Sequence, residues 1–421
     1  MAHPFSSQEN PMLSLRKTYF WILWYLLVIQ LVAPYAIKLS DEVGMVFILI
    51  SIFFDMVINR QFRRYRMLLI SIGIMAFYAV YTLLFHHFNT TSAVLLDFFL
   101  QCKPFVGLFG FYAIAPRFIA RERQILRITS VAVVLLSTIQ YWGLWHFEHG
   151  HAALVSALTY LFASVEDDGS VKPSCRRMAM VILALGLLCT RSKFYGETTL
   201  TVFMLFLYRP GMFRRIKPKQ IVILSLLLGA IIAVAWEKIS YYYLGGTEDQ
   251  FEVDVLESFA RPALFMGMLL VLADYPLLGS GLASYGSYGS AWHYSLAYYE
   301  YGLDKVWGLS EGYGDFICDN FVAQFAQVGI VGFVLFVAMF VWAYRKLRLV
   351  LHDESTMLFV VGIIAIATVP IESVGGTYFQ QWSGLYVMSL LGLIIGRYRD
   401  VSPERCKEIL QQDCKKLYST Q

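Results

Sequence analysis

Long apolar stretches recur along this 421-residue chain and constrain its fold more than any other feature. Many are long enough to cross the hydrocarbon core of a bilayer, which is about 30 Å thick. Apolar residues make up 58% of the chain and charged residues 15%, whereas a soluble domain has about 25% charged residues. The mean hydropathy is +0.57. The sequence therefore predicts an all-α polytopic membrane protein.

We expect about twelve transmembrane helices, several of them short enough to need tilt or local thinning of the bilayer. The expected spans are 19–38, 44–58, 67–86, 93–115, 128–147, 150–165, 178–190, 195–208, 220–237, 320–344, 356–371 and 377–396. Residues 1–238 would form the N-terminal membrane helices (about nine spans), 239–318 one large outer loop, and 319–421 the C-terminal membrane helices with a short cytoplasmic tail.

Basic residues cluster in alternate connections between these spans. The clusters are Arg16 and Lys17; Arg60, Arg63, Arg64 and Arg66; Arg117, Arg121, Arg123 and Arg127; Lys172, Arg176 and Arg177; Arg209, Arg214, Arg215, Lys217 and Lys219; Arg345, Lys346 and Arg348; and Arg397 and Arg399. Because cytoplasmic loops are rich in Lys and Arg, this alternation places both termini in the cytoplasm. We interpret the first span as a retained anchor rather than a cleaved signal peptide. The net charge of +4 reflects these loops and does not indicate nucleic-acid binding.

Arg191 and Arg261 depart from this pattern, because both are expected on the opposite, outer side. Arg261 belongs to the connection 239–318, which holds ten acidic and two basic residues and is too long for a simple turn. Within it, 253–274 is apolar enough to be helical. Counting that segment as a crossing would invert the topology of everything after it, so we expect it to lie on or dip into the outer leaflet.

The rest of this loop is rich in glycine, serine and tyrosine over 278–290 and is followed by further aromatic residues. Flat aromatic rings with a polar group, such as Tyr285 and Trp292, suit stacking on the faces of sugars. Equally, such residues form the aromatic belt that membrane proteins place at the level of the lipid headgroups. The glycines are not a nucleotide-binding fingerprint, because no strand precedes them.

Arg191 lies in Thr190-Arg191-Ser192-Lys193, a tight polar turn between two apolar spans. Its guanidinium group can bind phosphate oxygens in a bidentate manner, with Lys193 as a second cation. An arginine embedded in a membrane costs roughly 2.5–3.5 kcal/mol on insertion scales, so it is expected to have an anionic partner. Glu197 is the alternative partner, and an Arg191–Glu197 pair would be structural.

Two further candidates flank the same loop. Arg261 is a second possible anion ligand, or it forms an ion pair with Glu257, four residues earlier on the same helical face. Asp319 precedes Asn320 at the start of a span. Asp319 is either a helix N-cap or a general base at the outer surface, and the sequence alone favours neither.

Weaker candidates lie within the spans. Lys103 either reaches the same anion or pairs with Asp97, and Glu372 at the outer end of its span is a candidate of the same kind. Six cysteines show no metal-type spacing and no dense disulfide pattern. We therefore expect no metal ion and no cofactor.

Three segments resemble the O-antigen ligase and O-antigen polymerase family of bacterial membrane glycosyltransferases. They are the apolar run ending in Thr190-Arg191-Ser192; Arg261-Pro-Ala-Leu-Phe followed by Tyr275-Pro-Leu-Leu-Gly-Ser-Gly-Leu282; and Asp319-Asn320-Phe-Val-Ala-Gln324-Phe-Ala-Gln327-Val-Gly329-Ile-Val-Gly332. Together they cover about 190–335, and their order and common outer side are more specific than any one of them. The first 170 residues match as generic spans.

The resemblance implies a fold like that of the C-type glycosyltransferases. It also implies a donor glycan linked to undecaprenyl diphosphate, transferred with inversion to an acceptor hydroxyl without a metal ion. Arg191 and Arg261 match the positions that hold the diphosphate in the family. Asp319 stands where ligases typically carry a histidine that activates the acceptor; if Asp319 is not the base, Glu311 or Asp315 could serve.

We therefore expect a polysaccharide polymerase of the O-antigen or capsule type, acting at the periplasmic face of the bacterial inner membrane. Its partners would be the undecaprenyl-diphosphate-linked oligosaccharide, a glycan acceptor and membrane lipids, with a chain-length regulator protein as a further candidate. Its substrate-binding residues would be Arg191, Arg261, Lys193, Lys103, Asn320, Tyr285 and Trp292. The alternatives are an O-antigen ligase, which would use lipid A-core as acceptor, and a flippase for lipid-linked oligosaccharides. Transporters commonly have two related halves, and this sequence shows no convincing internal repeat.

Overall fold

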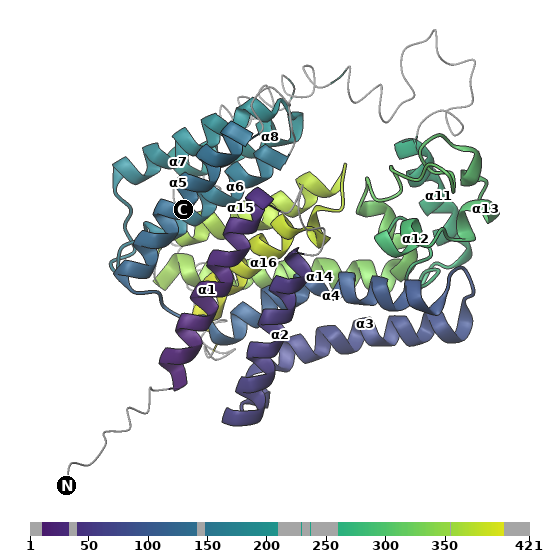
Figure 1. The fold of residues 1–421 in the computed structure, drawn as a ribbon, viewed down its shortest axis with the longest axis horizontal. Helices are drawn as coiled ribbons and strands as arrows, with labels where there is room; N and C mark the ends of the chain where they lie inside the picture. The colour runs from purple at the N-terminus through teal and green to yellow at the C-terminus, as the bar shows by residue number, and fades with distance from the viewer. Residues whose placement is uncertain are drawn as a thin grey trace, which may run out of the picture.

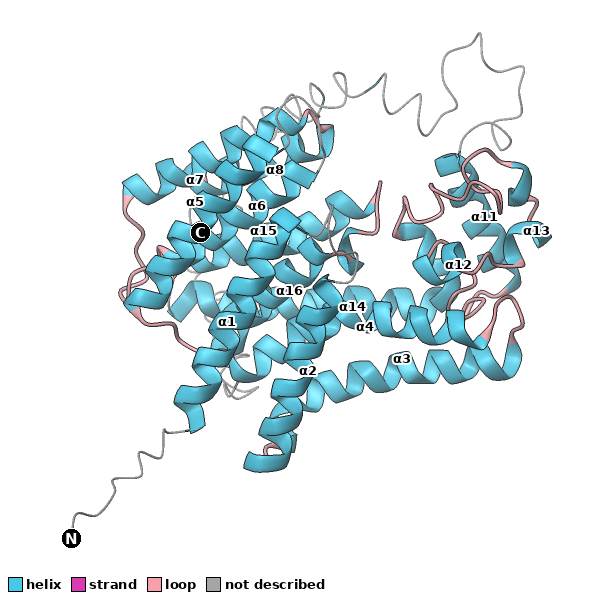
Figure 2. Cartoon of the chain, viewed as in Figure 1, coloured by secondary structure: helices cyan, strands magenta, loops and turns pink. Residues whose placement is uncertain are grey.

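The computed structural model describes residues 11–32, 40–140, 148–208, 260–353 and 355–399, together with the single positions 229 and 236. Across these ranges the chain forms helices joined by turns and loops, without a β-strand (Figure 2). The expected all-α class is therefore confirmed for this part of the chain.

A helix overlaps each expected span that falls in the described ranges, although several helices begin or end some residues away from the expected bounds. Their bounds are α1 (Pro11–Val32), α2 (Ser40–Asn59), α3 (Arg66–Phe85), α4 (Thr91–Ile114), α5 (Ala120–Gln140), α6 (Glu148–Ala163), α7 (Pro173–Gly186), α8 (Ser192–Phe206), α11 (Ala260–Asp274), α12 (Tyr288–Trp292), α13 (Ala297–Glu300), α14 (Phe325–Asp353), α15 (Thr356–Ser373) and α16 (Trp382–Ile395). The expected span at 220–237 lies outside the described residues, apart from two single positions.

The basic clusters that are described gather at one end of the helical bundle, which we call the basic end. There the start of α1 contacts the start of α5 through Arg16 and Glu122, at 3.3 Å. The end of α14 contacts the end of α16 through a 2.8 Å hydrogen bond from Lys346 to the carbonyl of Tyr398. The guanidinium of Arg399 in turn donates to the carbonyl of Ala113 at the end of α4. These contacts agree with the alternation of basic connections in the sequence.

The other end of the bundle, which we call the site end, carries a lobe formed by residues 260–318. The lobe has a small core of its own, with Leu264 on α11 and Tyr285 and Tyr298 from the following loops fully buried. It sits on the connection between α3 and α4, where the N–H of Leu296 donates to the carbonyl of Phe88 at 2.9 Å (Figure 1). The long acidic loop of the sequence therefore packs as a compact lobe in its described part.

Four helical segments are long and apolar enough to cross a membrane: Phe62–Phe85, Thr91–Ile114, Val322–Leu351 and Thr356–Ser373. The first and third bury little of their apolar surface within the protein. Phe77 and Phe85 on α3 and Val334 on α14 each expose more than half of their side chain. Large apolar faces of this kind require a nonpolar environment outside the protein, such as lipid.

The glycine-rich segment after α11 packs against a break in α14. The N–H groups of Ser280 and Gly281 donate to the carbonyls of Ala326 and Gln327 at 2.9 and 3.0 Å. The N–H groups of Ile330 and Val331 donate in return to the carbonyls of Pro276 and Leu277 at 3.0 and 3.1 Å. This exchange follows from the backbone of Gly329, whose φ of 62° and ψ of −167° interrupt the helix. The expected helix from 320 is therefore a short 3₁₀ turn, Val322–Gln324, followed by the interrupted α14.

Gly279 is required at this junction, which makes it a test of the packing. Its φ is +74°, and a Cβ atom there would lie 2.4 Å from the carbonyl oxygen of Ala326. We expect Gly279→Ala to destabilise the protein by at least about 1–2 kcal/mol, because a left-handed conformation alone costs an L-residue that much. Thermal unfolding in detergent measures the loss.

Gly73→Ala is the matched control, because Gly73 lies within α3 and a Cβ atom there meets no neighbour within 4 Å. We expect the control to be neutral or slightly stabilising, since alanine favours a helix over glycine by about 1 kcal/mol. Equal effects of the two substitutions would show that the junction does not depend on Gly279.

Candidate functional site

The turn that carries Arg191 is held in a strained conformation at the site end. Thr190 has a φ of 53°, in the left-handed region that a β-branched residue rarely adopts. Arg191 follows as the N-cap residue of α8. Beneath the turn, the Nε2–H of His149 on α6 donates to the carbonyl of Leu185 at 2.9 Å. Such strain persists where the surrounding structure fixes it, and it is concentrated at functional sites.

Arg261, the second residue of α11, forms an ion pair and hydrogen bond with Asp319. The two residues are 58 positions apart in the chain. Their side chains are 23% and 28% exposed, so the pair lies at an accessible surface. The alternative partner, Glu257, lies outside the described residues.

Asn320, not Asp319, makes the local capping contact. The Oδ1 of Asn320 accepts a 2.9 Å hydrogen bond from the N–H of Val322, which begins the 3₁₀ turn before α14. The remaining side-chain amide of Asn320, Nδ2, is buried and has no hydrogen-bond partner in the described structure. A buried donor without a partner is costly, so it is a natural contact for a ligand or a water molecule. Asp319 instead pairs with Arg261.

Lys193 is fixed by the end of α15. Its Nζ donates to the Glu372 carboxylate at 2.7 Å, to the Glu372 carbonyl at 3.2 Å and to the Gly375 carbonyl at 3.0 Å. These three acceptors account for all three donors of an ammonium group. In this structure Lys193 therefore anchors the turn to the end of α15. Its expected role as a substrate ligand stays a prediction.

Glu372 is the centre of a buried charged cluster that the sequence did not predict. Its carboxylate lies 3.4 Å from Nε2 of His151, whose Nδ1 lies 3.3 Å from Glu148. Glu197 on α8 is buried nearby, close enough for the charges of Glu372, His151 and Lys193 to act on it. No local pattern links these positions, because they come from α6, α8 and α15.

One segment, 372–376, connects the two halves of the site. On one side it binds Lys193, two residues after Arg191. On the other side, the carbonyls of Ser373 and Gly376 accept hydrogen bonds from the N–H of Phe321 at 3.1 and 3.2 Å. Phe321 follows Asp319 and Asn320 directly. The Arg191 turn and the Asp319 turn are therefore both fixed to the end of α15.

The electrostatic environment of Arg191 indicates that acidic groups from both turns act on it. Burial lowers the pKa of Arg191, whereas the charges of Glu372, Glu148 and Asp319 raise it. Asp319 thus acts on Arg191 through space and on Arg261 through direct contact. The structure brings the three main sequence-predicted site residues together at one end of the bundle.

Other expected site residues have different roles. Lys103 does not pair with Asp97; its Nζ lies 2.6 Å from both Asp41 and Glu42 at the start of α2, which leaves it buried and doubly paired. Asp97 instead accepts the N–H of Ala283 from the lobe at 2.9 Å. These contacts hold the lobe and α2 against α4, so Lys103 has a structural role in this structure. Its expected role as a substrate ligand stays a prediction.

The two aromatic candidates, Tyr285 and Trp292, differ in their exposure. Tyr285 is fully buried and donates to the carbonyl of Leu264 at 2.8 Å, so the expectation that it contacts a sugar is not supported. Trp292 is 57% exposed at the end of α12, with its ring centroid 5.8 Å from that of Tyr288. The hydroxyl of Tyr288 accepts a 2.9 Å hydrogen bond from Thr377. Burial raises the pKa of Tyr288 to about 12, so it stays a neutral hydrogen-bonding group.

Comparison with protein-family models, with curated protein sequences and with solved structures yields no match. The geometry must therefore carry the functional argument. It presents a partly exposed arginine and carboxylate, a second arginine in a strained turn and an unsatisfied amide donor. Such a set can bind a multiply charged anion and place a carboxylate beside it.

Lys193→Met tests whether the cluster around Glu372 holds the site end together. Removing the cation leaves a buried carboxylate, which costs about 3 kcal/mol at the lower end of the range for buried pairs. We expect unfolding in detergent to show this loss, and the double variant Lys193→Met/Glu372→Gln to recover a large part of it.

Lys172→Met is the control, because Lys172 pairs with Glu166 at 3.0 Å but the two side chains are 69% and 45% exposed. An exposed pair contributes about 0–1 kcal/mol. If both single variants lose the same stability, the pairing of Lys193 is not the organising contact that we describe.

Proposed function

We propose that this chain is a multi-pass glycosyltransferase of the O-antigen or capsule polymerase type. It would extend a glycan carried on undecaprenyl diphosphate at the periplasmic face of the bacterial inner membrane. The observation that supports this most is the convergence of Arg191, Arg261 and Asp319 from three distant segments. With it we propose about twelve membrane crossings in an arrangement like that of the C-type glycosyltransferases, with both termini in the cytoplasm.

The chemistry requires little beyond these groups. When the bond between the donor sugar and the diphosphate breaks, negative charge develops on the leaving diphosphate. Two preorganised guanidinium groups stabilise that charge electrostatically. A carboxylate positioned beside the acceptor hydroxyl takes its proton as the new glycosidic bond forms, an effect that typically adds roughly 10²–10⁴-fold in rate.

Asp319 is the favoured base among the acidic residues of the loop. Glu311, one alternative, is on the exposed part of the lobe and accepts a 2.7 Å hydrogen bond from Tyr299. Asp315, the other alternative, is also exposed. Asp319 alone among these three contacts Arg261 in the described structure. A base beside the diphosphate ligand is what the transfer requires.

The lipid part of the donor also has a suitable place. An apolar groove of about 310 Å³ lies between α3, α4 and α14, lined by residues such as Ile74, Phe105 and Phe336. Phe321, which directly follows Asn320, lines the same groove. A polyprenyl chain in this groove would thus lead its diphosphate toward the proposed clamp.

The ion pair between Arg261 and Asp319 implies an order of events. In the unliganded protein each group neutralises the other, so Arg261 does not offer its full charge to a phosphate and Asp319 is held away from an acceptor. A donor diphosphate would take over Arg261 and release the carboxylate. We therefore propose that the donor binds before the acceptor is activated.

Two alternatives remain as proposals. An O-antigen ligase would use the same residues with lipid A-core as acceptor, and the length of the product separates the polymerase from the ligase. Loss of a polymerase leaves single repeats on the final acceptor, whereas loss of a ligase leaves long chains on the carrier lipid.

The second alternative is a flippase or other carrier. The observation that favours it is the buried cluster of His151, Glu148 and Glu372, because buried His and Glu groups often form proton relays in transporters.

The decisive experiment uses purified protein and a synthetic repeat unit on undecaprenyl diphosphate. We expect longer glycans to form with or without EDTA, and Arg191→Ala, Arg261→Ala and Asp319→Ala to reduce their formation at least 100-fold, a typical loss for such groups. Strict dependence on a metal ion would overturn the arginine mechanism. In cells, repeat units that accumulate on the cytoplasmic face in these variants would favour the carrier.

Asp319→Asn tests the ion pair separately. Removing the carboxylate charge weakens the competition of Asp319 for Arg261, so we expect undecaprenyl diphosphate to bind up to about fivefold more tightly, the equivalent of about 1 kcal/mol for a partly exposed pair. Glycan transfer should be lost at the same time. Microscale thermophoresis measures whether the affinity for undecaprenyl diphosphate rises or falls. Asp315→Asn is the control and should leave binding unchanged; weaker binding by Asp319→Asn would show that the pair positions Arg261 instead.

A further inference from the structure

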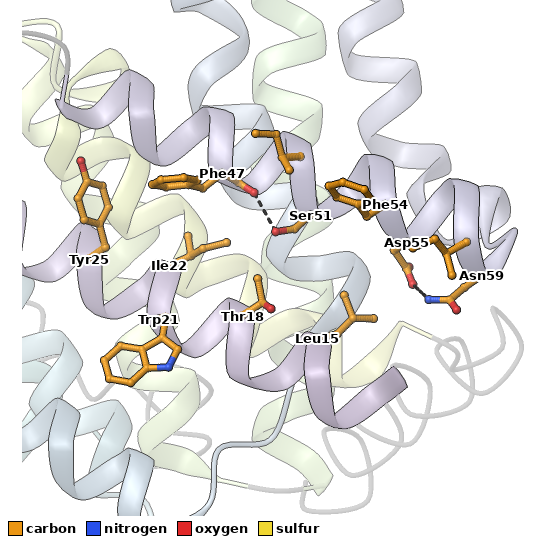
Figure 3. Close-up of a pocket in the computed structure, with 12 residues that line it drawn as sticks. Leu15, Thr18, Trp21, Ile22, Tyr25, Phe47, Ser51, Phe54, Asp55 and Asn59 are labelled. Carbon is orange, nitrogen blue, oxygen red and sulfur yellow. Dashed lines mark hydrogen bonds between the residues drawn. The ribbon is translucent and has the colours of Figure 1, made fainter. Parts of the chain in front are cut away.

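A groove separate from the proposed site runs between α1 and α2. It encloses about 840 Å³ and is lined by Leu15, Thr18, Trp21, Ile22 and Tyr25 on α1 and by Phe47, Ile50, Ser51, Phe54, Asp55, Ile58 and Asn59 on α2. Figure 3 shows these side chains between the two helices, with Tyr25 toward one end and Asp55 and Asn59 toward the other. The groove is therefore apolar along most of its length and polar at one end.

The apolar part of the groove is open. Trp21 is 55% exposed and Ile58 70% exposed, although both are large apolar side chains. Exposed apolar surface of this extent marks a binding surface or a contact with lipid. The shape alone does not identify the occupant; the polar end of the groove does.

The chain that follows the groove at this end carries several cations. The carboxylate of Asp55 accepts hydrogen bonds from Asn59 at 2.5 Å, Tyr65 at 2.6 Å and Arg64 at 3.0 Å, so its charge is satisfied within the protein. Arg60 follows the lining residue Asn59, and Arg63 lies three residues further on; both are exposed. An apolar groove whose last lining residue, Asn59, is followed directly by exposed arginines matches a molecule with an acyl chain and an anionic headgroup.

We propose that this groove binds an anionic phospholipid. One acyl chain would lie along the groove between α1 and α2, and the phosphate would contact Arg60 and Arg63 at the basic end. Arginine suits phosphate because its planar group of donors matches the oxygens. Basic pockets at the ends of membrane helices recognise anionic lipids in this manner. The proposal does not depend on the glycosyltransferase activity.

A bound lipid at this position would also support the site end indirectly. The opposite end of α2 carries Asp41 and Glu42, which hold the buried Lys103 of α4. A lipid between α1 and α2 would cover the exposed face of α2 and fix its position relative to α1. We therefore expect anionic lipid to raise the thermal stability of the protein as well as to bind.

Trp21 provides a direct probe of the groove. The full-length protein in detergent is mixed with phosphatidylglycerol or phosphatidylcholine whose acyl chains are brominated, and quenching of tryptophan fluorescence is measured. We expect phosphatidylglycerol to quench at roughly thirtyfold lower concentration, because two arginines near a phosphate together contribute about 2 kcal/mol. Trp21→Phe should remove the preferential part of the quenching, which assigns it to this groove.

Two matched charge variants complete the test. Arg60→Gln/Arg63→Gln should abolish the preference for phosphatidylglycerol, whereas Arg121→Gln/Arg177→Gln, which removes two other exposed arginines of the basic end, should retain it. Equal quenching by the two lipids, or a preference that survives Arg60→Gln/Arg63→Gln, would overturn the proposal. Absence of Trp21 quenching by either lipid, together with self-association, would show that a second copy or another protein covers the groove.

Discussion

The buried carboxylate of Glu372 is the constraint on which the site end depends. A carboxylate that is 2% exposed is costly unless it is paired and hydrogen-bonded. Lys193 and His151 supply the opposite charges, and they come from different helices. Satisfying this one charge therefore fixes α6 and α8 against the end of α15. The adjacent carbonyls then hold Phe321, so a single electrostatic requirement positions both the Arg191 turn and the Asp319 turn.

The sequence predicted what depends on local composition. Helices occur where apolar stretches predict them, and the basic connections in the described residues gather at one end, because span length and charge alternation are properties of neighbouring residues. The ion pairs of Lys193 and Lys103 could not be predicted from neighbouring residues. Lys193 and Glu372 are 179 positions apart, and Lys103 pairs with Asp41 rather than with Asp97 on its own helix. Only tertiary packing selects among several carboxylates that are all plausible partners.

The break at Gly329 is a related case. An apolar run with a capping residue predicts a continuous helix, but the backbone of the glycine-rich segment replaces the helical hydrogen bonds at this point. Two of the three segments that carry the family resemblance thus bind one another through their backbones. The glycines at these positions are explained by this close approach, because side chains at Gly279 or Gly329 would overlap the opposing carbonyl groups.

Carboxylates beside the arginines are at first sight unfavourable for a site that would bind a diphosphate. In the absence of a ligand, however, partly buried cations without counter-charges would repel one another and lower the stability of the fold. Asp319 and Glu372 both reduce that repulsion, but they differ in how easily a ligand could displace them. Asp319 is partly exposed and can be displaced, whereas Glu372 is buried and fixed by Lys193. In the proposed function, a monovalent anion would gain less from Arg261 than a diphosphate, which would bring several charges to both arginines at once. The exchangeable pair would therefore select for polyvalent anions, while the fixed pair maintains the structure in which that selection takes place.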